Sequence, residues 1–136
     1  HGPRGGDELN LIVKGGNYGW PNIAHSINYN DAALVTPWDD SGKYQQPIFR
    51  WIPSIGACGL DVVRGPAFPK WKGDLVAGGL SGANVDRIRV KDGKLVEREE
   101  LIHGMGRVRD VVVGPDGYIY VALNQPDKIV RIVPAN

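Results

Sequence analysis

Short stretches of alternating polar and apolar residues recur along the chain, and most are rich in valine, isoleucine or tyrosine. Such runs, bounded by glycine, proline, aspartate or asparagine, are typical of β-strands. No segment has the 3.6-residue periodicity and the caps of an amphipathic helix. The pattern therefore predicts an all-β protein with strands at 8–13, 73–79, 85–90, 94–102, 109–114, 118–124 and 128–133.

An internal repeat underlies the second half of the chain. The motif Asp-Val-Val-x-Gly-Pro begins at Asp61 and again at Asp110, and each copy is followed by a strand, a turn and a strand containing Arg-Ile. A repeat of about 40–50 residues with about four short strands is typical of a β-propeller blade, because one such sheet cannot bury both faces alone. The first strand of a blade lines the central channel, so we expect the Asp-Val-Val segments to be innermost.

The repeat predicts one β-propeller fragment over residues 1–136, with about two and a fraction four-stranded blades. Residues 1–23 are expected to be closing strands of a preceding blade. Residues 24–60, polar and irregular up to residue 46, are expected to form a long loop and linker. A complete blade is predicted at 61–102, and a last blade without its outer strand at 103–136.

Composition narrows the class of protein. The chain has 136 residues, of which 42% are hydrophobic, enough for one domain with a packed core. A formal net charge of +1 argues against a nucleic-acid binder, and no apolar run is long enough for a membrane span. The single cysteine, Cys58, excludes an internal disulfide and is interpreted as a small buried or half-buried thiol. Because the chain begins at His1, with neither methionine nor signal peptide, we expect a processed chain or a piece of a longer one.

Three segments carry a family resemblance. They read HGPRGGDELNLIVKGGNYGWP at 1–21, QQPIFRWIPSIGACGLDVV at 45–63 and GRVRDVVVGPDGYIYVALN at 106–124. Together they resemble the soluble sugar dehydrogenases that depend on pyrroloquinoline quinone (PQQ), the glucose/sorbosone and aldose sugar dehydrogenase group. The resemblance implies the C-terminal portion of a six-bladed β-propeller that uses PQQ and calcium to oxidise the C1 hydroxyl of a sugar. It also implies a periplasmic or secreted protein.

Two arginines stand one residue apart before the last Asp-Val-Val segment. Side chains two apart on a strand point the same way, so Arg107 and Arg109 are expected to project together with Val108 on the other face. A guanidinium fork suits a carboxylate or quinone oxygen through charge-assisted hydrogen bonds. From the residues alone, the alternative is an arginine pair that only makes a loop more soluble. The resemblance places the family's paired PQQ-binding arginines on these two positions.

The resemblance also implies two calcium sites. Gly2 and Pro3 match a Gly-Pro whose backbone carbonyls hold the calcium that bridges to PQQ, and carbonyl oxygens are suitable ligands for this ion. Glu8, Tyr18 and Asn28 fall where some family members hold a second, structural calcium. A plain turn at Gly2 and Pro3, and simple packing of Tyr18, are the alternatives.

Two further polar residues are candidates for the rim of the cofactor site. Ser81 lies near a position where the glucose-type enzymes place a lysine against PQQ, and here the sequence GGLSGANV offers no cation. The aldose-type relatives also tend to have small residues there, which favours that branch. Asn84 is the other polar candidate at the same rim.

The family's catalytic base is not among the histidines of this chain. The base must reach the sugar hydroxyl by a hydrogen bond, and in the family it comes from an early blade. His1, His25 and His103 do not match it, although His103 is a candidate for the substrate side of the pocket. We therefore expect a piece that contributes cofactor contacts without dehydrogenase activity of its own. The alternative is a non-catalytic β module that self-associates to close its open sheet edges.

Overall fold

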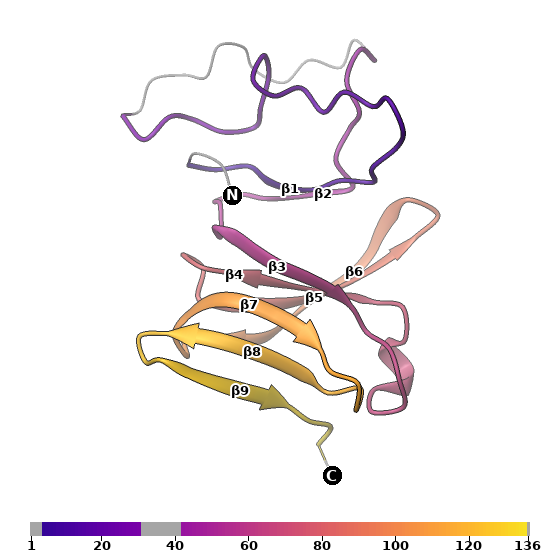
Figure 1. Ribbon diagram of the computed structural model, residues 1–136. Helices are drawn as coiled ribbons and strands as arrows, with labels where there is room; N and C mark the ends of the chain where they lie inside the picture. Colours follow the sequence, from indigo (N-terminus) through magenta and orange to yellow (C-terminus); the bar gives the residue numbers. More distant parts are fainter. Residues whose placement is uncertain (1–3, 31–41, 136) are drawn as a thin grey trace. The chain divides into compact units, whose positions relative to one another are not determined.

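The computed structural model describes residues 4–30 and 42–135, which fall into two compact units, His1–Ile55 and Gly56–Asn136. Regular structure in the described residues is β-strand apart from one short 3₁₀ turn, η1 (Pro69–Trp71), and no α-helix is present there (Figure 1). The all-β prediction is confirmed.

The first unit is mostly irregular chain around one small sheet. Strand β1 (Asp7–Leu9) pairs with β2 (Phe49–Trp51) in antiparallel register, with Asp7 opposite Trp51. Among the described residues of this unit, the buried apolar side chains are Leu9, Ile23, Tyr44, Trp51 and Ile55. The interval 24–60, expected as loop and linker, therefore holds β2 and also the beginning of the next strand. A three-residue strand is too short to leave an alternation that the sequence would reveal.

The strand predicted at 8–13 is much shorter than expected. It stops at Leu9, and Leu11 and Ile12 are exposed instead of lying in a sheet. The partner strand is only three residues long and follows Pro47, which has no N–H to extend the ladder. The hydroxyl of Tyr18 holds the following loop: it accepts the Val13 N–H at 2.7 Å and donates to the Leu11 carbonyl at 2.9 Å.

The second unit contains two antiparallel sheets whose strands follow one another in chain order. The four-stranded sheet has the order β3-β4-β5-β6 and the three-stranded sheet the order β7-β8-β9, as the repeat predicts. Their bounds are β3 Ala57–Val62, β4 Leu75–Gly79, β5 Asn84–Lys91, β6 Lys94–His103, β7 Arg107–Val113, β8 Ile119–Asn124 and β9 Lys128–Ile132. Division of the whole chain into blades stays a prediction.

The core of this unit lies between the two sheets. Strand β8 alternates buried and half-buried residues, so Ile119, Val121 and Leu123 all face the same way. They pack with valines of both sheets in one apolar cluster, whose other buried members are Val63, Phe68, Val76, Val85, Val108 and Val111. Burying such a side chain contributes about 1.5–3 kcal/mol, so this cluster is the main force joining the sheets.

A β-bulge interrupts each inner strand. In β3 the register shifts between Cys58 and Leu60, at Gly59, whose φ is +69°. A Cβ at Gly59 would lie 2.6 Å from the Val111 nitrogen and 2.7 Å from an Asp110 carboxylate oxygen. Only glycine fits there, because it tolerates positive φ and lets β3 approach β7 directly.

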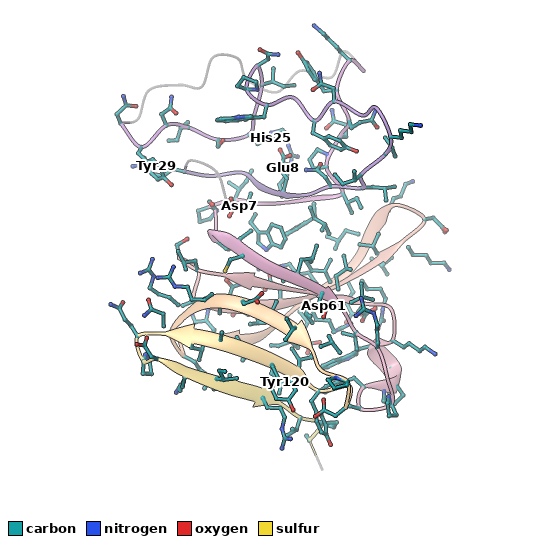
Figure 2. The ribbon with its side chains drawn as sticks, in the orientation of Figure 1. Asp7, Glu8, His25, Tyr29, Asp61 and Tyr120 are labelled. Carbon is teal, nitrogen blue, oxygen red and sulfur yellow. The ribbon has the colours of Figure 1, made fainter. Side chains whose placement is uncertain are left out.

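The first Asp of the repeat joins the two sheets. One Asp61 oxygen accepts the Val113 N–H of β7 at 2.8 Å, and the other accepts the adjacent Val62 N–H at 2.7 Å (Figure 2). Arg64 adds an ion pair at 3.1 Å. Partial burial opposes ionisation, but these hydrogen bonds and the guanidinium outweigh it and hold the pKa of Asp61 below its usual value.

Candidate cofactor-binding site

The candidate residues of the second unit gather at one end of its sheets. The ladder aligns Ala57 with Gly79, Gly79 with Asn84, and Asn84 with His103. Strands β3 and β7 run in the same direction, as Figure 1 shows, so the end of the four-stranded sheet that carries Asn84 lies beside the start of β7 at Arg107.

The two arginines and Val108 divide between outside and inside as predicted. Arg107 and Arg109 are exposed, while Val108 is fully buried. The register adds a feature that simple alternation lacks: the ladder skips Arg109, since Val108 pairs with Leu123 and Asp110 with Ala122. Arg109 is therefore the bulged residue of β7.

Both arginines are neighbours of Asn124. Arg107 lies directly across the ladder from Asn124, and Nη2 of Arg109 donates to Oδ1 of Asn124 at 3.0 Å. The guanidinium of Arg107 makes no hydrogen bond or ion pair with any residue that the structure describes. The start of β7 thus presents two cationic forks, which fits a ligand with several carboxylates.

The turn after β8 completes this group of residues. Nδ2 of Asn124 donates to Asp127 at 2.7 Å, and the Gln125 N–H donates to the same carboxylate oxygen at 3.2 Å. The hydrogen bond from Asn124, then that from Gln125, and the charge of Arg109 lower the pKa of Asp127, although desolvation opposes them. The sequence analysis missed Asn124 and Asp127; their signal is the Asn-Gln-Pro-Asp turn that follows the β8 pattern.

Cys58 is the half-buried thiol that the sequence predicts. Its Sγ donates to the carbonyl of Val108 at 2.9 Å. Burial raises its pKa, the charge of Asp110 adds to this, and the charge of Arg109 acts in the opposite direction. The thiol is therefore protonated at neutral pH and is a poor nucleophile.

Ser81 and Asn84 differ in exposure. Ser81 is exposed in the turn between β4 and β5. Its Oγ lies close to Gly56, since a Cβ placed on that glycine would be 3.0 Å from it. Asn84 is only 2% exposed; its Nδ2 donates to Asp86 at 3.0 Å, and its buried Oδ1 has no hydrogen-bond partner. Asn84 is thus held in the sheet beside Asp86, and its contact with the cofactor stays a prediction. The role of Ser81 stays a prediction.

The residues expected to bind calcium are only partly described. Gly2 and Pro3 lie outside the described residues. On β1, Glu8 (labelled in Figure 2) accepts a hydrogen bond from Asn10 at 3.2 Å, and the Oδ1 of Asn10 is buried without a partner. Burial raises the pKa of Glu8, while the bond from Asn10 and the charge of Arg50 lower it.

Carboxylate and amide oxygens are suitable donors for a hard cation, so Glu8 and Asn10 together fit part of a calcium site. The hydroxyl of Tyr18 is occupied by the loop contacts described above, which leaves only its backbone carbonyl for a metal. Asn28 follows the bridge between Arg4 and Ile27. The described residues contain no group of three or more His, Cys, Asp or Glu side chains arranged around a metal position.

Both described histidines, His25 and His103, have side-chain partners within the chain. His103 is exposed, and its Nδ1 lies 3.2 Å from a carboxylate oxygen of Glu100. Both ring nitrogens of His25 are 2.8 Å from Nη1 of Arg50 in the first unit. His1 lies outside the described residues.

Sequence comparisons place the chain among sugar dehydrogenases. The family model described as Glucose / Sorbosone dehydrogenase matches residues 1–131. The chain is 35% identical to aldose sugar dehydrogenase YliI of Escherichia coli over 139 residues, which is 100% of the chain and 38% of that protein. It is 41% identical to an uncharacterized protein of Synechocystis over 125 residues, 92% of the chain and 30% of that protein.

Solved structures agree. A glucose dehydrogenase crystal structure matches all of the chain and 40% of its own length, with a TM-score of 0.88 and 36% identity. The apo-form of the soluble aldose sugar dehydrogenase of E. coli matches with a TM-score of 0.82 and 34% identity, again over 100% of the chain and 40% of its length. The PQQ-bound aldose sugar dehydrogenase of Streptomyces coelicolor, at 19% identity and a TM-score of 0.61 over 93% of the chain and 37% of its length, supports the fold alone.

The chain thus spans 30% to 40% of the length of these proteins. Their likeness confirms the second part of the fold prediction, a partial β-propeller of the kind found in PQQ dehydrogenases. The match over residues 1–131 and the structural similarity agree with the three segments on which the resemblance was drawn. The chain belongs to the glucose/sorbosone dehydrogenase family.

Proposed function

We propose that the chain acts as the C-terminal portion of a PQQ- and calcium-dependent aldose dehydrogenase, in which Arg107 and Arg109 bind the cofactor. The observation that carries this proposal is the pair of guanidinium groups at the start of β7, one of them without a described partner. When bound, PQQ supplies the electrophilic quinone that receives hydride from the sugar C1.

In that reaction, the residues of this chain bind and orient the cofactor. Arg107 is free to donate paired N–H groups to a carboxylate, and Arg109 keeps its Nε and Nη1 groups for the same ligand. The hydrogen bond that Arg109 donates to Asn124 holds this guanidinium in place, whereas the guanidinium of Arg107 can adjust to the ligand. Ser81, exposed in the neighbouring turn, is proposed as a neutral polar contact at the rim.

Calcium binding is proposed for two places. Gly2 and Pro3 would offer carbonyl oxygens to the ion beside PQQ, as the resemblance implies. The carboxylate of Glu8 and the carbonyl of Tyr18 would hold a structural ion, with Asn28 as a further candidate. The unpartnered Oδ1 of Asn10 supports an oxygen-rich position next to Glu8.

Following the resemblance, we assign proton removal from the sugar to a histidine of an early blade, which none of the histidines of this chain matches. Of the histidines described, His103 is engaged by a carboxylate and His25 by a guanidinium. We therefore expect the chain alone to bind cofactor without oxidising sugar. The described residues contain no helix long and apolar enough to cross a membrane. A periplasmic or secreted location is proposed from the family resemblance.

A PQQ titration in the presence of calcium tests this function. We expect a shifted quinone absorbance with the parent chain, and about 10- to 100-fold weaker binding for Arg107→Ala or Arg109→Ala, since each removes charge-assisted hydrogen bonds. Arg131→Ala is the matched control, because Arg131 lies in the same sheet over the ring of Tyr118, away from this end. Equal affinity in all four proteins would rule out the proposed role of the arginines.

One observation favours a second function, self-association of a non-catalytic β module. Val63 in the first repeat is 1% exposed, whereas Val112, its equivalent in the second repeat, is 46% exposed. The register places Val112, Tyr120 and Arg131 in one row, and Ala122 and Ile129 in the next, on the same uncovered face. Ile129 is 75% exposed. Apolar side chains on an uncovered sheet favour a partner sheet.

A further inference from the structure

We infer that Asn124 and Asp127 are positioning residues that hold the guanidinium of Arg109 toward its anionic ligand. The inference rests on the proposed function, in which Arg109 binds the carboxylates or quinone of PQQ. The three side chains form one continuous series of hydrogen bonds from β7, through the end of β8, to the turn before β9.

The donors and acceptors of this series permit only one arrangement. A guanidinium can only donate and an ionised carboxylate can only accept. Asn124 stands between them with its Oδ1 3.0 Å from Arg109 and its Nδ2 2.7 Å from Asp127. A flipped amide would put N–H against N–H and oxygen against oxygen. The carboxylate of Asp127 therefore fixes the amide, and the amide fixes one edge of the arginine.

The turn that carries the carboxylate is itself held in two ways. Its backbone N–H at Gln125 donates to the same Asp127 oxygen at 3.2 Å. It also packs against Gly106, the residue just before β7: a Cβ on Gly106 would lie 3.2 Å from the Gln125 carbonyl oxygen and 3.3 Å from that of Asn124. The anchor and the arginine are therefore tied to the same end of the sheet.

Arg107 provides an internal contrast. It pairs with Asn124 across the ladder, yet its guanidinium has no hydrogen-bond partner among the described residues. A loss of the Asn124 side chain should therefore release Arg109 and leave Arg107 as it was. In the parent chain Arg109 has Nη2 committed to Asn124, while its Nε and Nη1 remain available to a ligand.

A double-mutant cycle with PQQ as the probe tests the inference. We expect Asn124→Leu and Asp127→Ala each to weaken PQQ binding about 2- to 10-fold, the effect of losing a hydrogen bond. Asp127→Asn, which keeps an acceptor oxygen, should restore most of the affinity. In an Arg109→Ala background, Asn124→Leu should have no further effect, because the residue it positions is gone. A full additional loss in that background would overturn the inference.

A second measurement does not depend on the cofactor. Nitrogen-15 relaxation of the arginine side chains should show Arg109 more ordered than Arg107 in the parent chain, and as mobile as Arg107 in Asn124→Leu. Asp116→Ala is the control, since this carboxylate holds Tyr120 and the Tyr118 N–H in the other turn of the same sheet. Equal mobility of the two arginines in the parent chain would refute the inference. Absence of PQQ binding together with an ordered Arg109 would count against the proposed function alone.

Discussion

At the scale of single residues, we propose that Arg107 and Arg109 at the start of β7 bind the cofactor, whereas Asp61 joins the two sheets of the second unit. Asp61 accepts N–H groups from both of the strands that meet there, whereas its repeat equivalent, Asp110, accepts only the adjacent Val111 N–H, at 2.9 Å, among the residues that the structure describes. The same motif position therefore has a different structural role in each repeat. Asp61 joins two sheets, and Asp110 orders its own strand beside the bulge.

The lowered pKa of Asp61 predicts a pH-dependent stability. A carboxylate with a depressed pKa stabilises the fold above its unfolded value, about 3.9, and loses that contribution as the pH falls through the folded value. Asp61→Asn should lower the free energy of unfolding by about 1–3 kcal/mol at pH 7, and by progressively less below pH about 4. Urea unfolding of both proteins across this range measures the difference.

Asp110→Asn is the matched control for that experiment. It alters the same motif position but removes only a local hydrogen bond, so its effect should be much smaller. A loss for Asp61→Asn that stays constant from pH 7 to pH 3, or that Asp110→Asn reproduces in size, would contradict the role given to the junction.

Secondary-structure elements were predictable where the sequence alternates over five or more residues. Strands β4 to β9 lie within a few residues of the expected ranges, because most of them place alternate Val, Ile or Leu side chains in or against one continuous core. Strand β1 was predicted at 8–13 but is only three residues long, and β2 was not predicted, since three residues cannot show a period. Strand β1 ends at Leu9 because its partner β2 has only three residues. The alternation of residues 8–13 does not encode the length of that partner.

The geometry of the site was only half predictable at this scale. Alternation correctly put Val108 inside and the arginines outside. It did not reveal the bulge at Arg109, since a bulge depends on how β7 packs against β3 and β8. The same packing explains Gly59, the point where β3 meets Asp110 and Val111.

At the scale of the whole molecule, the chain spans 37% to 40% of the length of the glucose and aldose sugar dehydrogenases compared above. We propose that the cofactor contacts of this chain form one portion of a larger site. The sheet face that bears Val112 and Ile129 is exposed in the described residues. In a propeller, neighbouring sheets cover such faces.

The open face gives a prediction about self-association. If copies of the chain cover one another, sedimentation should show a concentration-dependent dimer, and Val112→Lys or Ile129→Lys should return it to a monomer. Lys94→Glu, at the exposed hairpin of the other sheet, is the control for altered charge. A monomer at all concentrations would reject this second function and leave the cofactor-binding proposal in place.

The central claim is that two arginines at the start of a propeller strand converge on one anionic cofactor. A crystal structure of the chain with PQQ and calcium tests it most directly. Our account predicts the guanidinium groups of Arg107 and Arg109 within hydrogen-bond distance, about 2.7–2.9 Å, of oxygens on the same PQQ molecule. A bound PQQ that neither arginine contacts, or two guanidinium groups pointing apart around it, would contradict the account.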